Sequence, residues 1–132
     1  MKKFNYNQCG KYFAKGFKLK VHIKNQVDNG ANIIQIFDSW AGLLDEKDLP
    51  NYVYSPTLNL VNYVKSLNIP VICFPREIKN YKEFCDIVKP DAVSIDYNVD
   101  PKKILRDISI PIQGGLDPVS YTHLTLPTSI QV

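Results

Sequence analysis

Short apolar runs alternate with segments of helical periodicity along most of this 132-residue chain. The apolar runs predict four buried strands, at residues 33–37, 69–74, 92–95 and 110–113. Before and between them, apolar residues recur every three or four positions, which predicts helices that begin near Leu19, Ser55, Asn80 and Asp100. An alternation of strands and helices requires parallel strands, because each helix returns the chain to the same edge of the sheet. We therefore expect an α/β fold with about four parallel strands and intervening helices on one side.

Local signals mark several helix ends. Ser55 followed by Pro56 predicts an N-cap and a first helical residue, and Asn80 with Glu83 is typical of a capping box. Asn29-Gly30 and Lys89-Pro90 each predict the end of a helix. Residues 1–16 show neither helical nor strand periodicity, so they stay unassigned, and a non-native origin of this segment is one alternative.

Polar residues follow the first strand directly, as Asp38 and Ser39. Ligands bind at the carboxyl ends of strands in α/β folds, so Phe37, Asp38 and Ser39 are candidates for a functional edge. Asp96 ends the third predicted strand in the same way. The two aspartates could form a pair of catalytic acids, but we favour a structural role for both, as caps of the loops at the strand ends.

Three ordered motifs carry a family resemblance. Residues 30–42 (GANIIQIFDSWAG), 93–97 (VSIDY) followed by 100–103 (DPKK), and 111–118 (PIQGGLDP) resemble segments of uroporphyrinogen decarboxylases. The last motif has Gly115 where the family usually has Asn. Together the motifs cover about residues 17–118, and the resemblance implies that this region is half of a (β/α)8 TIM barrel.

The resemblance also implies a function. Uroporphyrinogen decarboxylases remove carboxyl groups from the acetate side chains of a tetrapyrrole, without metal or organic cofactor, and work as cytoplasmic homodimers. Protonating a pyrrole carbon turns the ring into an electron sink for the departing CO2. Ser39 matches a position that binds a substrate carboxylate, Phe37 matches a pocket-lining residue, and Gln113 with Gly114 would shape the pocket floor. The family's arginines, pyrrole-facing Asp, Tyr and His have no counterpart here, so no catalytic residue is assigned and the chain is expected to be an inactive fragment.

Composition narrows the alternatives. A net charge of +3 does not indicate a nucleic-acid partner, although seven lysines precede the first acidic residue, Asp28. The three cysteines, Cys9, Cys73 and Cys85, form no Cys-x-x-Cys pair, which argues against a disulfide framework and a zinc site. Neither a signal peptide nor a membrane span is predicted, so we expect a cytoplasmic protein without nucleic-acid or membrane partners.

Residues 119–132 break the βα pattern. The string VSYTHLTLPTS resembles the translation of a sequencing-library adaptor, so we expect an artefactual tail and give His123 no role. A natural strand extension is the alternative. Two other functions stay open: a corrinoid-linked methyltransferase of the same barrel superfamily, which would need a zinc site, and a non-enzymatic binding half-barrel.

Overall fold

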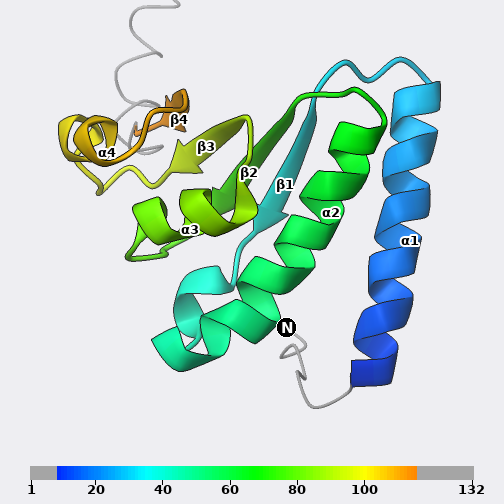
Figure 1. The fold of residues 1–132 in the computed structure, drawn as a ribbon, viewed down its shortest axis with the longest axis horizontal. Coiled ribbons are helices and arrows are strands. Elements are labelled where there is room, and N and C mark those ends of the chain that lie inside the picture. The colour runs from blue at the N-terminus through cyan, green and yellow to red at the C-terminus, as the bar shows by residue number, and fades with distance from the viewer. Residues whose placement is uncertain (1–8, 116–132) are drawn as a thin grey trace, which may run out of the picture.

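A computed structural model describes residues 9–115 of the chain, with side chains from Lys18 onward. Four helices and four strands make up its framework (Figure 1). In chain order these are α1 (Cys9–Asp28), β1 (Ile34–Asp38), α2 (Ser55–Ser66), β2 (Val71–Pro75), α3 (Tyr81–Val88), β3 (Ala92–Ile95), α4 (Pro101–Asp107) and β4 (Ile112–Gly114). Three short helical turns, η1 (Ala41–Leu43), η2 (Glu46–Asp48) and η3 (Pro50–Tyr54), connect β1 to α2.

The four strands form one parallel sheet in the order β1-β2-β3-β4. Each strand therefore pairs with the next one along the chain, with a helix in between, which is the arrangement of half a (β/α)8 barrel. The predicted α/β architecture is confirmed. Strand bounds differ from the predicted ones by one or two residues, except for β3, which matches.

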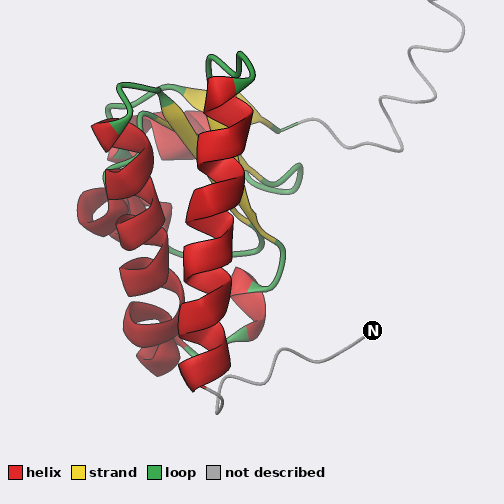
Figure 2. Cartoon of the chain, turned by 90° about the vertical axis from the view of Figure 1, so that its right-hand side faces the viewer, coloured by secondary structure: helices red, strands yellow, loops and turns green. Residues whose placement is uncertain are grey.

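The two faces of the sheet differ in composition. Side chains facing the helices are apolar and buried, including Ile34, Val71, Cys73 and Val93. They pack in one core with residues of α2 and α3, among them Val61, Val64, Phe84 and Val88. On the other face, Gln35 and Phe37 of β1 are exposed. We call this second surface the open face; no helix of residues 9–115 covers it (Figures 1 and 2).

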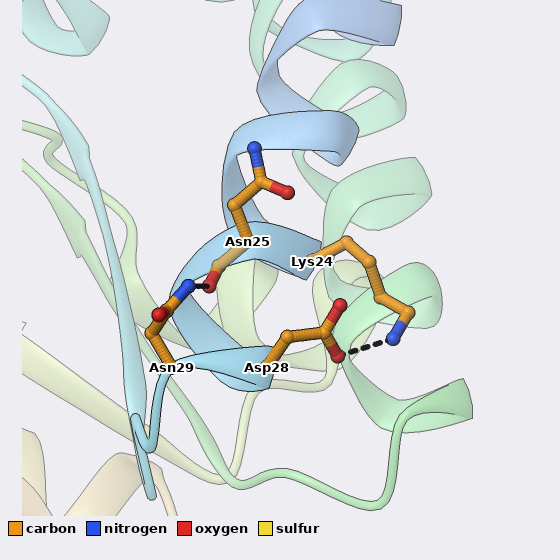
Figure 3. A network of polar contacts seen from close by, with 4 residues as sticks. All are labelled: Lys24, Asn25, Asp28 and Asn29. Carbon is orange, nitrogen blue, oxygen red and sulfur yellow. Dashed lines mark hydrogen bonds and ion pairs between the residues drawn. The ribbon is translucent and has the colours of Figure 1, made fainter.

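Helix α1 begins earlier than the sequence predicts, at Cys9 rather than near Leu19. It lies beside α2 (Figures 1 and 2), where Ile23 is buried and the Lys20 ammonium lies 2.9 Å from the Asn59 Oδ1 atom. Its carboxyl end closes as predicted at Asn29-Gly30. Lys24 pairs with Asp28, and the Asn29 side-chain amide donates to the Asn25 carbonyl oxygen at 2.7 Å; both contacts are drawn in Figure 3.

The predicted N-cap of α2 is wrong. Ser55 has helical dihedral angles and makes no capping hydrogen bond, because the π-helical turn η3 runs directly into α2. Val53 and Tyr54 of that turn are almost fully buried. The helical path therefore begins at Pro50, in the first turn of η3, while Pro56 still lies in the first turn of α2.

Helix α3 starts and ends where the sequence predicts. The Asn80 side chain accepts a hydrogen bond from the Glu83 backbone N–H at 2.9 Å, and Lys89 ends the helix in a left-handed conformation. The Glu83 carboxylate, however, accepts from the Tyr54 hydroxyl at 2.9 Å. Residues 1–8 and 116–132 lie outside the described part of the chain, and the expected origins of segments 1–16 and 119–132 stay predictions. No helix within residues 9–115 is long and apolar enough to cross a membrane.

Candidate functional site

Phe37 lies on the open face near the carboxyl end of β1. Its side chain is 64% exposed, although phenylalanine in a strand is normally buried. Register places it opposite Phe74 of β2, and the two ring centroids are 5.7 Å apart at an interplanar angle of 58°. The two rings together form an apolar surface on the open face.

Ser39 follows β1 in a tight turn and is exposed. The turn is fixed by Asp38, whose carboxylate accepts from the Trp40 backbone N–H at 3.2 Å. Burial raises the pKa of Asp38, while the backbone N–H groups of Trp40 and Ala41 act in the opposite direction. The favoured capping role of Asp38 is thus supported by its contacts, and the turn places Ser39 beside Phe37 at the same edge of the sheet.

The loop after β1 is held against the loop after β2. The Gly42 N–H donates to the Arg76 carbonyl oxygen at 3.0 Å, and the Arg76 N–H donates to that of Asp38 at 3.0 Å. A Cβ atom on Gly42 would lie 2.3 Å from the Glu77 carbonyl oxygen. Only glycine permits this approach, so the edge that carries Ser39 is firmly positioned.

Asp96 is a structural residue of the β3 end. Its Oδ2 atom accepts from the Glu77 N–H at 2.7 Å and from the Tyr81 hydroxyl at 2.9 Å, and its own N–H donates to the Tyr81 hydroxyl oxygen at 3.3 Å. Burial raises the pKa of Tyr81, which therefore stays a hydroxyl donor. These contacts support the loop-ordering role that we favoured over catalysis.

A polar network crosses the open face beside the aromatic pair, toward the amino end of β1. The Gln35 amide Nε2 donates to the Ser94 Oγ atom at 3.1 Å and to the Gln113 Oε1 atom at 3.2 Å, and the Ser94 hydroxyl donates to the same oxygen at 2.6 Å. In a flat sheet, β1 and β4 would be about 14 Å apart and their side chains would stand perpendicular to it. The direct contact between Gln35 and Gln113 therefore shows that the open face is concave.

Sequence reasoning named Gln113 but missed Gln35 and Ser94. A signal was present, because Gln35 is two residues before Phe37 and so shares its face of β1. Gly114 and Gly115, which follow Gln113, have φ angles of 95° and 91°. A Cβ on Gly114 would lie 2.9 Å from the Ile95 carbonyl oxygen, and Gly115 takes a left-handed conformation that glycine adopts without strain.

A pocket among the described residues lies away from this face. It has a volume of about 260 Å³ and lies between the η1–η2 segment and the start of α3, lined by residues such as Leu49, Glu77 and Ile78. Residues of the loops that follow β1 and β2 line this pocket, and neither Phe37 nor any residue of the polar network is among them. Residues 9–115 contain no group of three or more His, Cys, Asp or Glu side chains arranged to hold a metal ion.

Comparison with known proteins identifies the family. The family profile described as uroporphyrinogen decarboxylase (URO-D) matches residues 19–130. Among similar curated proteins, the uroporphyrinogen decarboxylase of Wolbachia sp. subsp. Drosophila simulans (strain wRi) is 42% identical over 101 residues, covering 74% of this chain. Those of Rickettsia bellii (strain RML369-C) and Orientia tsutsugamushi (strain Ikeda) are 39% and 38% identical, again over 74% of this chain. The chain spans about 30% of the length of these relatives. The three ordered motifs, the parallel half-barrel and these matches agree: the chain belongs to the uroporphyrinogen decarboxylase family.

Proposed function

We propose that this chain is a substrate-binding part of an enzyme that decarboxylates uroporphyrinogen to coproporphyrinogen in haem biosynthesis. The observation that carries the proposal is the pairing of an exposed aromatic surface, Phe37 on Phe74, with the exposed Ser39 hydroxyl two residues after Phe37. A tetrapyrrole has an apolar ring system and carboxylates around its rim. Phe37 would contact the ring, and Ser39 would donate a hydrogen bond to a carboxylate.

The proposed role of the chain is binding and orientation. Decarboxylation needs a proton donor to a pyrrole carbon and a group that stabilises the resulting cation. We assign this purpose to neither described aspartate at the strand ends, since the contacts of both support a structural role: Asp38 accepts from the Trp40 N–H, and Asp96 accepts from the Glu77 N–H and the Tyr81 hydroxyl. The chain alone should therefore bind the tetrapyrrole without decarboxylating it. For the whole enzyme we propose a cytoplasmic homodimer.

Titration with uroporphyrin tests the binding role. Uroporphyrin, the stable oxidised form of the substrate, is added to the 132-residue chain and its fluorescence is followed. Ser39→Ala removes one hydrogen bond to a charged group and should weaken binding about tenfold, and Phe37→Ala should do at least as much. The controls are Ser55→Ala and Leu19→Ala, which truncate exposed residues on α2 and α1. Equal affinities for all five proteins would contradict the proposal.

A chimera tests the enzymatic role. The segment of the Wolbachia relative that aligns with this chain is replaced by the matching residues of this chain. The chimera should convert uroporphyrinogen to coproporphyrinogen, measured by chromatography of the oxidised products. It should lose activity on Ser39→Ala and keep it on Ser55→Ala. A folded chimera without activity would refute the assignment of this segment to a competent decarboxylase.

A further inference from the structure

Ser94 is a polar residue in a buried position on the concave side of the sheet. It is 4% exposed, and its hydroxyl donates to the Gln113 Oε1 atom and accepts from the Gln35 Nε2 atom. A buried hydroxyl is costly unless it is hydrogen-bonded, so these two contacts determine how the glutamines are oriented.

The network fixes which atoms the two glutamines present. Gln113 accepts two hydrogen bonds through its Oε1 atom, so its Nε2 amino group lies on the other side of the amide. Among residues 18–115 that amino group donates no hydrogen bond, and Gln113 is exposed. Gln35 uses both of its Nε2 hydrogens within the network. The face therefore presents two N–H donors from Gln113 on β4.

We propose that Gln113 is a second carboxylate-binding residue of this face, held in its donor orientation by Ser94 and Gln35 as positioning residues. This inference rests on the proposed function, in which the ligand is a tetrapyrrole carrying carboxylates. Ser39 lies at the end of β1 and Gln113 lies on β4, with the Phe37–Phe74 pair on the same side of the sheet. A tetrapyrrole carries carboxylates on all four of its pyrrole rings, so a macrocycle lying on the aromatic pair can present different carboxylates to the two residues.

The fixed orientation is what makes Gln113 useful. An unrestrained surface glutamine loses rotamer freedom when it binds a ligand, and it presents its carbonyl oxygen as readily as its amino group. The Gln113 carbonyl oxygen is already occupied by Ser94 and Gln35. The network thus restricts the side chain before the ligand arrives, and it favours hydrogen-bond acceptors such as carboxylates over groups that donate hydrogen bonds.

Charge substitution at Gln113 tests the contact. In uroporphyrin titrations of the 132-residue chain, Gln113→Glu should weaken binding about tenfold, because it replaces two donors by an anion. Gln113→Lys should tighten binding several-fold, since an ammonium group also donates to carboxylates. Gln26 is an exposed glutamine on α1, and Gln26→Glu and Gln26→Lys make the same changes in net charge. Both controls should stay within about twofold of the unmodified chain.

For the positioning residues, the experiment must distinguish a loss of orientation at Gln113 from a loss of folding. Ser94→Ala should weaken uroporphyrin binding about threefold, whereas Ser94→Thr, which keeps the hydroxyl, should restore it, with thermal melting checked for both variants. If Gln113→Glu and Gln113→Lys both match the Gln26 controls while Ser39→Ala still weakens binding, this inference fails and the proposed function stands. If the unmodified chain does not bind uroporphyrin, both fail.

Discussion

Removal of one hydroxyl group should destabilise the chain strongly. Tyr81 is 3% exposed, and its hydroxyl donates to Asp96 Oδ2 at 2.9 Å while accepting from the Asp96 N–H at 3.3 Å. Tyr81→Phe keeps the ring and its packing but removes both hydrogen bonds. It leaves the Asp96 N–H without this partner next to a carboxylate that is itself 9% exposed.

The expected cost follows from these contacts. A hydrogen bond to a charged group contributes about 1.5–3 kcal/mol, and an unpaired buried N–H costs about 1–3 kcal/mol. The Glu77 N–H still donates to Asp96 at 2.7 Å, which retains part of the carboxylate's stabilisation. We therefore expect the free energy of unfolding to fall by about 2–3 kcal/mol. For a domain of about 100 residues, this corresponds to a decrease in Tm of roughly 10 °C or more.

Urea unfolding followed by circular dichroism near pH 7 measures this cost. The matched control is Tyr97→Phe, because Tyr97 is 56% exposed and lies next to Asp96 in the chain. A double-mutant cycle of Tyr81→Phe with Asp96→Asn should give a coupling energy of at least about 1 kcal/mol. A change below about 0.5 kcal/mol for Tyr81→Phe, or one equal to that of Tyr97→Phe, would refute the structural role of the Tyr81–Asp96 pair.

Three further predictions concern stability. Gly42→Ala should lower the free energy of unfolding in urea by at least about 2 kcal/mol, because its Cβ would lie 2.3 Å from a backbone oxygen. Gly30→Ala is the control: its Cβ would meet no atom, and only its φ of 104° is unfavourable for alanine, so it should cost about 1 kcal/mol. Equal costs for the two variants would contradict the close approach at Gly42. Burial raises the pKa of the Cys73 thiol from 9.0 to about 12, so its contribution to stability is complete below pH 9 and is lost as pH rises toward 12. The free energy of unfolding should therefore fall less steeply above pH 9 in Cys73→Ala than in the unmodified chain, and identical slopes would disprove this. Asp28→Asn breaks an exposed ion pair with Lys24 and should change stability by less than about 0.5 kcal/mol; a larger loss would show a contribution beyond the pair.

Local sequence signals predicted the parts of the fold that depend on neighbouring residues. Asn80 caps α3 and Asp100 caps α4, since each side chain reaches a backbone N–H only two or three residues away. The same signal failed at Ser55. There the burial of Val53 and Tyr54 in the core outweighs a capping preference of about 1 kcal/mol, and that burial depends on tertiary packing.

The candidate site was predicted only in part for a related reason. Phe37 and Ser39 stand in one short motif, so the sequence places them together. Gln35, Ser94 and Gln113 lie on three strands, and hydrogen bonds join the first to the last across 78 positions of the chain. Their contact depends on the curvature of the sheet, which no local pattern specifies.

The contacts of the two strand-end aspartates explain why they are not among the proposed binding groups. Asp38 shares its parity with Ile34 and Ile36, which are buried or half-buried toward the helices, and its carboxylate accepts a hydrogen bond from the turn that it begins. Phe37 shares its parity with Gln35 and faces the open side. At the end of β3, Asp96 shares its parity with Ser94, and there it is hydrogen bonding that occupies the carboxylate, which accepts from the Glu77 N–H and from the Tyr81 hydroxyl. The carboxylates thus order the strand-end loops, and the concave side is left to aromatic, hydroxyl and amide groups, which suits an anionic ligand because no carboxylate of β1–β4 repels it there.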